Sequence, residues 1–133
     1  MAALTLEIVT PEKRIATIQA DEVRAPGVVG GFGIRRDHTP FMSRLSPGRL
    51  TIVGPEGERH FALGGGFLQV ADNRVIVLAD SAEERAEIDT ERARKALAES
   101  SERVLGLGED DDGYPEEAAR VRRAMARLDV AGR

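Results

Sequence analysis

The chain has 133 residues and a formal net charge of −4, and it contains no Cys and no Trp. A chain of this length fits one compact domain, or one small domain with an appendage. The absence of Cys excludes disulfides and thiolate metal sites. Lys and Arg are interspersed with Asp and Glu until the C-terminal region, so we expect no nucleic-acid partner.

The N-terminal part of the chain alternates apolar and polar residues, which is typical of half-buried strands. Leu4, Leu6 and Ile8 follow this pattern, which differs from the basic start and apolar run of a signal peptide. Arg74–Ala79 is an almost continuous apolar run, which predicts a strand buried on both sides. No stretch approaches the roughly 20 apolar residues of a membrane helix, so we expect any membrane contact to be made through a partner.

Turn residues separate the strand-like runs. Pro55-Glu56-Gly57 lies between two of these runs and Asp72-Asn73 lies between two others, so each is expected to be the turn of a hairpin. Short strands at close spacing, with no helical pattern between them, predict an antiparallel β-sandwich. We place this domain at residues 1–84.

After Ser81 the apolar residues recur with the period of a helix. Asp89 is a good N-cap, with Thr90 and Glu91 in the first turn, and Gly106 is expected to end the first helix. The apolar stripe expected on this helix consists of Ala93, Ala96, Leu97 and Val104.

A second helix is expected after an acidic loop. Pro115 suits its first turn, and Glu116 and Glu117 suit its positive end. The apolar stripe expected on this helix consists of Ala118, Val121, Met125 and Leu128.

Residues 85–133 are therefore predicted to form an antiparallel helical hairpin. Its apolar faces are rich in Ala, and burial of Ala contributes far less than the roughly 1.5–3 kcal/mol of a Leu or Ile side chain. We expect the hairpin to be held weakly, both to itself and to the sandwich, and to be able to detach and extend.

Five segments, in chain order, resemble the sequences of one known family. They are Gly30–Ile34 with Asp37–Pro40 (G-E-L-G-I … G-H-x-P in the family), Leu63–Val70 (S-G-G-F-L-E-V), Val75–Ala79 (V-T-V-L-A), Ile88–Ala93 (I-D-x-x-R-A) and Arg123–Leu128 of the last helix. No single motif is specific, but five in register over almost the whole chain are hard to obtain by chance. The sequence is identified on these segments as a member of the epsilon subunits of bacterial rotary F-type ATP synthases.

The resemblance implies a fold, a function and a set of partners. The family fold is a ten-stranded β-sandwich followed by a two-helix hairpin. The function is that of a non-catalytic rotor component in the central stalk, which couples ion flow through the c ring of the proton-translocating synthase to ATP synthesis. The sandwich would dock on the gamma subunit and the c ring, and the helices would reach the alpha and beta subunits transiently and inhibit ATP hydrolysis. The location would be peripheral, on the cytoplasmic face of the bacterial plasma membrane.

A polar loop lies where the family contacts the c ring. Its residues are Arg35, Arg36, Asp37 and His38, and charged side chains suit the polar loops of that ring. The alternative is an ordinary solvated turn closed by Pro40. Gly31 stands where many members of the family carry Glu, so an ion pair from that position to the ring is missing here.

The resemblance also implies a regulatory ATP, although no cofactor is required. The residues matching nucleotide-binding positions are Glu83, Ile88, Asp89, Arg92, Ala93, Arg123 and Arg127. On an ideal helix Asp89 and Arg92 lie about 60° apart, so both can face one ligand. Arg92 offers a planar fork to phosphate, and Arg123 and Arg127 are expected to join it from the second helix.

An alternative explanation of these residues remains open. Asp89 suits an N-cap without any ligand, and basic residues near the C-terminus of a helix complement its dipole. Arg120, Arg123 and Arg127 lie on one stripe of the second helix, and this stripe also suits contact with acidic segments of the beta subunits. Glu99 stands where nucleotide-binding members carry Arg, and its carboxylate would repel phosphate.

No other motif indicates an active site. Gly64-Gly65-Gly66 lacks the Lys-Ser/Thr of a phosphate loop and is interpreted as a close backbone approach. His38 and His60 have no pattern of further ligands nearby, so we expect no metal and no catalytic residue. A free-standing nucleotide sensor or adaptor with the same fold is the second hypothesis.

Overall fold

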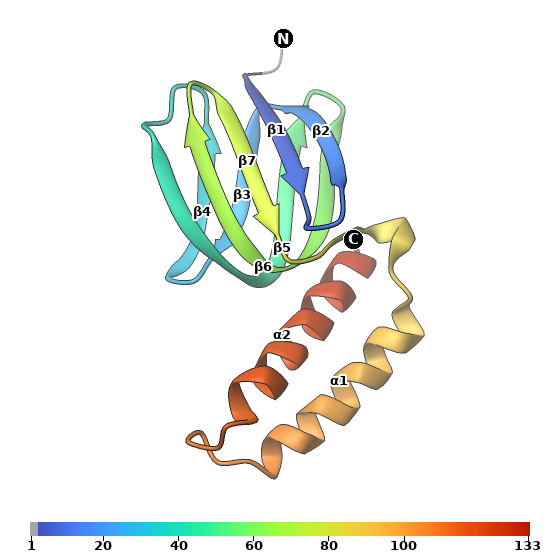
Figure 1. Cartoon of the computed structure of the whole chain (residues 1–133). Coiled ribbons are helices and arrows are strands. Elements are labelled where there is room, and N and C mark those ends of the chain that lie inside the picture. The colour runs from blue at the N-terminus through green and yellow to red at the C-terminus, as the bar shows by residue number, and fades with distance from the viewer. Residues whose placement is uncertain (1–2) are drawn as a thin grey trace.

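The chain folds into a β-sandwich from which a two-helix hairpin extends (Figure 1). The computed structural model describes residues 3–133, so residues 1–2 of the predicted domain 1–84 lie outside the described part. The strands are β1 (Leu4–Val9), β2 (Arg14–Ala20), β3 (Glu22–Gly27), β4 (Gly30–Arg35), β5 (Phe41–Gly54), β6 (Gly57–Ala71), β7 (Arg74–Ala79) and β8 (Ala82–Glu84). A short 3-10 turn, η1 (Arg85–Glu87), leads to the helices α1 (Thr90–Leu105) and α2 (Tyr114–Ala131).

The sheet runs in the order β2-β1-β7-β6-β5-β3-β4, with β8 paired to β6. The described residues thus form eight strands in place of the ten that the family resemblance implied. The difference arises because β5 and β6 are long strands, of 14 and 15 residues, that stay paired along their length and serve both layers. The pairing is antiparallel except between β1 and β7, which run parallel.

Both predicted hairpin turns are confirmed. Gly54 pairs with Gly57 across the β5–β6 turn. Asp72 and Asn73, at the β6–β7 turn, have φ angles of 51° and 61°, as a two-residue type I′ turn requires. Asn73 is therefore held in a fixed orientation, which matters for the neighbouring polar loop.

The core of the sandwich is made by the inward faces of the strands. The predicted alternation in β1 is confirmed, since Leu4, Leu6 and Ile8 are all buried. The prediction that Arg74–Ala79 is buried on both faces is wrong, because Leu78 is 53% exposed. Only the inward face of β7 meets the core, and its outward face remains apolar without being covered.

The glycine run of β6 marks a close backbone approach, as predicted. Gly66 has a φ of 143°, and a Cβ at this position would collide with the carbonyl oxygen of Leu78 in β7. Gly64 donates its N–H to the carbonyl oxygen of Ser81, at 2.9 Å. The run therefore lies where the pairing partner of β6 changes from β8 to β7.

Helix α1 begins as the sequence predicted. The Asp89 side chain accepts a hydrogen bond from the backbone N–H of Arg92 at 3.1 Å, and Gly106 is the C-cap. Ala93 and Ser100 are buried on this helix. Ser100 was not in the predicted stripe. Because it follows Ala93 by seven residues, or about two helical turns, its position on the same face could have been predicted.

The stripe predicted for α2 is partly wrong, because Met125 is 56% exposed. The buried residues are instead Ala124, Ala126 and Val130. Ala124 and Ala126 lie about 200° apart on a helix, so they face opposite sides. The helix is covered on one side by α1 and on the other by the sandwich, which explains why small residues are buried on both sides.

The contact between α2 and the sandwich is small and partly ionic. Ala126 and Val130 pack with Ala62 of β6 and with Ile88. No Leu or Phe belongs to this cluster, in agreement with the expectation of a weakly held hairpin. Among residues 3–133, no helix has the length and apolar character needed to cross a bilayer.

Candidate functional site

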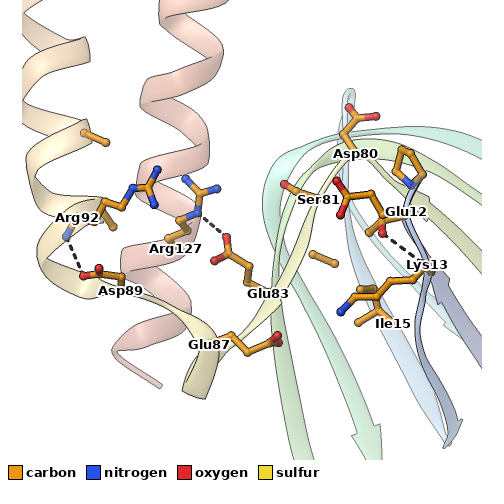
Figure 2. Close-up of a pocket in the computed structure, with 15 residues that line it drawn as sticks. Glu12, Lys13, Ile15, Asp80, Ser81, Glu83, Glu87, Asp89, Arg92 and Arg127 are labelled. Atoms are coloured by element: carbon orange, nitrogen blue, oxygen red, sulfur yellow. Dashed lines mark hydrogen bonds and ion pairs between the residues drawn. The ribbon is translucent and has the colours of Figure 1, made fainter.

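A cavity of about 910 Å3 lies between the β1–β2 turn, the segment from Asp80 to Glu83 and the helices (Figure 2). It brings together five of the residues predicted to bind nucleotide, which are Glu83, Asp89, Arg92, Ala93 and Arg127. Segments far apart in the sequence therefore meet at the place where the sandwich joins the hairpin.

The helix α1 presents its first turn to this cavity. Asp89 uses one carboxylate oxygen to cap the helix and keeps the other available. Arg92 is exposed, whereas Ala93 is only 2% exposed, and its small side chain takes up little of the cavity volume. Figure 2 shows the Arg92 and Arg127 side chains entering the same region from α1 and α2.

Arg127 is already engaged by a carboxylate. Its Nε donates to Glu83 Oε1 at 2.6 Å, and both side chains are about one-third exposed, at 33% and 30%. This ion pair joins α2 to β8. A phosphate group entering the cavity would therefore have to compete with Glu83 for Arg127.

Two of the predicted nucleotide residues lie elsewhere. Ile88 packs beneath α2 with Ala62, Ala126 and Val130. Arg123 is not among the cavity residues, and its guanidinium lies 3.4 Å from Glu116, two turns earlier on the same face of α2. The expected gathering of three Arg side chains is thus reduced to Arg92 and Arg127.

The cavity is more acidic than the sequence suggested. Its lining includes the carboxylates of Glu12, Asp80, Glu83, Glu87 and Asp89, against Lys13, Arg92 and Arg127. Sequence reasoning missed Glu12, Lys13 and Asp80 because they come from turns of the sandwich, distant in sequence from the helices. Glu99 is not a lining residue and lies 3.8 Å from Arg103, so its charge acts on this cavity only from a distance.

The polar loop Arg35–His38 is fixed by a contact with another turn. The backbone N–H of Asp37 donates to Asn73 Oδ1 at 2.6 Å, and Asn73 Nδ2 donates to Asp37 Oδ1 at 3.2 Å. His38 stacks edge-on against Phe41, with ring centroids 5.7 Å apart. Arg35 lies 3.6 Å from Glu22, whereas Arg36 is exposed. The loop is thus a braced turn that presents charged groups at one end of the sandwich.

An exposed apolar patch covers the neighbouring part of the sheet. We define this apolar patch as Met42, Phe67 and Leu78, which are 65%, 46% and 53% exposed. Phe67 pairs with both Arg44 and Leu78, and the Arg44 guanidinium lies 5.6 Å from the Phe67 ring centroid. Sequence reasoning did not single out these residues. The signal that could have identified them is the run of apolar residues in β7, where an exposed face would usually carry polar ones.

No group of three or more His, Cys, Asp or Glu within residues 3–133 is arranged to hold a metal ion.

Comparison with known protein families accounts for this combination of sandwich, cavity and hairpin. Residues 3–85 match the family model described as "ATP synthase, Delta/Epsilon chain, beta-sandwich domain", and residues 86–132 match the "long alpha-helix domain" of the same chain. This chain belongs to the ATP synthase delta/epsilon chain family.

Curated relatives agree with this family over nearly their whole length. An ATP synthase epsilon chain of Anaeromyxobacter dehalogenans strain 2CP-C is 66% identical over 131 residues, covering 98% of this chain and 99% of the relative. An ATP synthase epsilon chain of Myxococcus xanthus is 47% identical, covering 98% and 96% of the two chains. The resemblance to bacterial epsilon chains inferred from the five motifs is thereby confirmed.

Solved structures show that the fold is shared with chains of much lower sequence identity. A chain of the Euglena gracilis mitochondrial ATP synthase superposes with a TM-score of 0.81 at 21% identity, covering 100% of this chain and 83% of that one. A chain from the central stalk and c ring of the Tetrahymena thermophila synthase gives a TM-score of 0.59 at 19% identity, with 95% and 92% coverage. Epsilon chains are non-catalytic subunits of the central stalk of F-type ATP synthases, so this chain is a non-catalytic stalk component.

Proposed function

We propose that this epsilon chain turns with the rotor and couples ion flow through the c ring to ATP synthesis. The observation that carries the proposal is the apolar patch of Met42, Phe67 and Leu78, which is exposed on the sandwich beside the braced loop Arg35–His38. An apolar surface of this kind suits a lasting protein contact, here the gamma subunit. The charged loop suits the polar loops of the c ring.

The helical hairpin is the part of the chain that would restrain ATP hydrolysis. It is held to the sandwich by the small apolar cluster of Ala126, Val130, Ala62 and Ile88 and by the partly exposed ion pairs Arg127–Glu83 and Arg49–Asp129. Contacts of this kind are weak enough to keep the docked and released states close in free energy. A released hairpin can reach the alpha and beta subunits. This balance is what a regulatory element requires.

Deletion of residues 88–133 tests this function. The truncated chain is expected to assemble with the other subunits and to raise ATP hydrolysis by the complex. Unchanged hydrolysis would show that inhibition resides elsewhere, and loss of assembly would show that the sandwich alone does not make the stalk contacts. Co-purification with gamma and c subunits separates this function from that of a free-standing sensor.

A regulatory ATP is the ligand that the cavity between sandwich and hairpin would take. Asp89, Arg92, Ala93 and Arg127 line it together, and the two guanidinium groups suit phosphate oxygens. Calorimetry of the whole chain should give binding heat with ATP that Arg92→Ala removes. Arg122→Ala, an exposed position on the same hairpin outside the cavity, is the matched control. An equal loss in both variants, or no heat at millimolar ATP, would refute the site.

The cellular location follows from the proposed partners. The similarity to bacterial epsilon chains and the proposed contact with the c ring support a peripheral location on the cytoplasmic face of the plasma membrane. The membrane would be reached only through the ring. Fractionation should recover the chain with membranes and release it when the stalk is stripped from them.

A further inference from the structure

The helix α2 rests on a second polar cluster, which lines a different cavity from the one proposed for nucleotide. Thr51 pairs with Arg24 on one side and with His60 on the other, so these three residues form a row across β3, β5 and β6. Arg49, two residues before Thr51, shares its face of the strand. The C-terminal end of α2 lies over this row.

An ion pair connects α2 to this row. Arg49 Nη1 donates to both carboxylate oxygens of Asp129, at 2.8 and 3.0 Å. Arg49 Nε also donates to Thr51 Oγ1 at 3.3 Å, and Arg133 Nη2 lies 3.2 Å from Asp129. Two cations and one carboxylate thus meet at the place where the helix touches the sheet.

His60 is enclosed by this arrangement. Its Nδ1 lies 3.1 Å from Thr51 Oγ1, its Nε2 lies 3.5 Å from Glu58, and its side chain is only 16% exposed. His60, Asp129 and Arg133 line one cavity of about 760 Å3, together with Glu22 and Arg24 of β3 and with Arg49 and Glu58. Part of the cover over His60 is therefore supplied by α2 itself.

We infer that His60 makes the docking of the helical hairpin sensitive to protons, so that acidification favours release of α2 from the sandwich. The inference rests on the proposed function, in which the hairpin moves between docked and released states. A positive charge on His60 would be placed beside Arg49 and near Arg133 in a site with little access to water. Release of α2 admits water.

The sign of the effect follows from the charges around the imidazole. Burial lowers the pKa of His60 most, and Arg49 lowers it further, while Glu58 and Asp129 raise it less and Arg133 lowers it. Release of α2 removes its share of that burial together with the charge of Arg133, which outweighs the loss of Asp129, so the docked state is expected to bind the proton less readily than the released state. Docking is at full strength above the ordinary His pKa of about 6.5 and weakens as the pH falls through and below it.

Spin labels can measure this effect on the whole chain. Because the sequence has no Cys, Glu56→Cys in the β5–β6 turn and Arg122→Cys on α2 give two defined label positions. Distance distributions are recorded between about pH 8 and pH 5.5, a range in which carboxylates stay ionised and His titrates. The fraction of long, released distances is expected to rise several-fold at the acidic end.

The chain offers a matched control, because it has only two His residues. His60→Gln keeps a polar contact to Thr51 and is expected to abolish the pH step, whereas His38→Gln retains it. His60→Asn repeats the test if the Gln variant does not fold by circular dichroism. A pH step that persists in the folded His60 variants would overturn the inference.

The outcomes also separate this inference from the proposed function. Released distances that appear equally at both pH values leave the mobile hairpin intact and overturn only its proton sensitivity. A hairpin that stays docked at every pH, even after Asp129→Asn removes the ion pair to Arg49, would overturn both.

Discussion

Arg127 on α2 donates a hydrogen bond of 2.6 Å to Glu83 on β8, and both side chains line the cavity proposed for nucleotide. The same contact thus closes the hairpin onto the sandwich and neutralises one of the two guanidinium groups available to phosphate. Docking of α2 and binding of an anion therefore compete for one side chain.

We expect Glu83→Gln to strengthen ATP binding. The amide still accepts a hydrogen bond from Arg127 but no longer carries the charge that opposes phosphate. Since the pair is partly exposed, the gain should be modest, up to about fivefold in affinity. Calorimetry of the full chain measures it, with Glu84→Gln on the adjacent position of β8 as a control. A weaker affinity in Glu83→Gln would mean that Glu83 itself contacts the ligand favourably.

Gly66→Ala should destabilise the sandwich strongly. A Cβ at this position meets the backbone of β7 at Leu78 and Ala79, and the φ of 143° is unfavourable for Ala. The expected loss in free energy of unfolding is about 2–4 kcal/mol. Urea denaturation followed by circular dichroism checks this value. Gly31→Ala, whose Cβ would come no closer than 3.7 Å to Ala25 O, should change stability by less than about 0.5 kcal/mol.

Leu78→Ser should weaken assembly without unfolding the chain. Leu78 is 53% exposed, so its loss costs the fold little, but it removes one of the three side chains of the apolar patch. If the apolar patch contacts the other stalk subunits, the affinity of the variant for them should fall at least about tenfold in a pull-down titration. Leu105→Ser replaces a still more exposed Leu, 87% exposed at the far end of α1, and should have no such effect. Equal binding by both variants would show that the contact surface lies outside the apolar patch.

Glu22→Gln should reduce the loss of stability in acid. Its hydrogen bond with Arg24, helped by the charge of Arg35, lowers the pKa of the Glu22 carboxyl despite some desolvation. A lowered folded-state pKa means that this contribution is present above pH 4.5 and is lost as the pH falls through the folded pKa. Urea midpoints measured between about pH 6 and pH 3 should therefore fall less steeply in the variant. Glu56→Gln, exposed in the β5–β6 turn, should leave the slope as it is in the original chain.

Local chemistry explains which parts of the fold were predictable. The Asp72-Asn73 turn and the Asp89 cap depend on residues adjacent in sequence, and both were predicted from residue type alone. The burial of Ala124 and Ala126 on opposite sides of α2 was not predictable in this way, because a single apolar stripe was assumed. Ala gives a weak signal in any periodicity, and only the tertiary arrangement shows that α2 is covered on two sides.

The candidate sites were predictable only where a family motif marked them. The motif Ile88–Ala93 pointed to the cavity, and the structure places Asp89, Arg92 and Ala93 there. The Arg49–Asp129 pair joins residues 80 positions apart, and no local pattern relates them. The same applies to the enclosure of His60, whose neighbours come from three strands and a helix.

The unusual length of β5 and β6 has a mechanical consequence. The two strands are paired from Phe41–Val70, beside the apolar patch, to Gly54–Gly57, with only Ser46 and Gly65 left out of the register between these ends. Stretching such a ladder requires many backbone bonds to shear at once, so it behaves as a stiff bar. If the apolar patch contacts the stalk as proposed, strain applied there would be transmitted along β5 and β6 to the surface on which α2 rests, so load on the stalk would change how firmly the hairpin is docked.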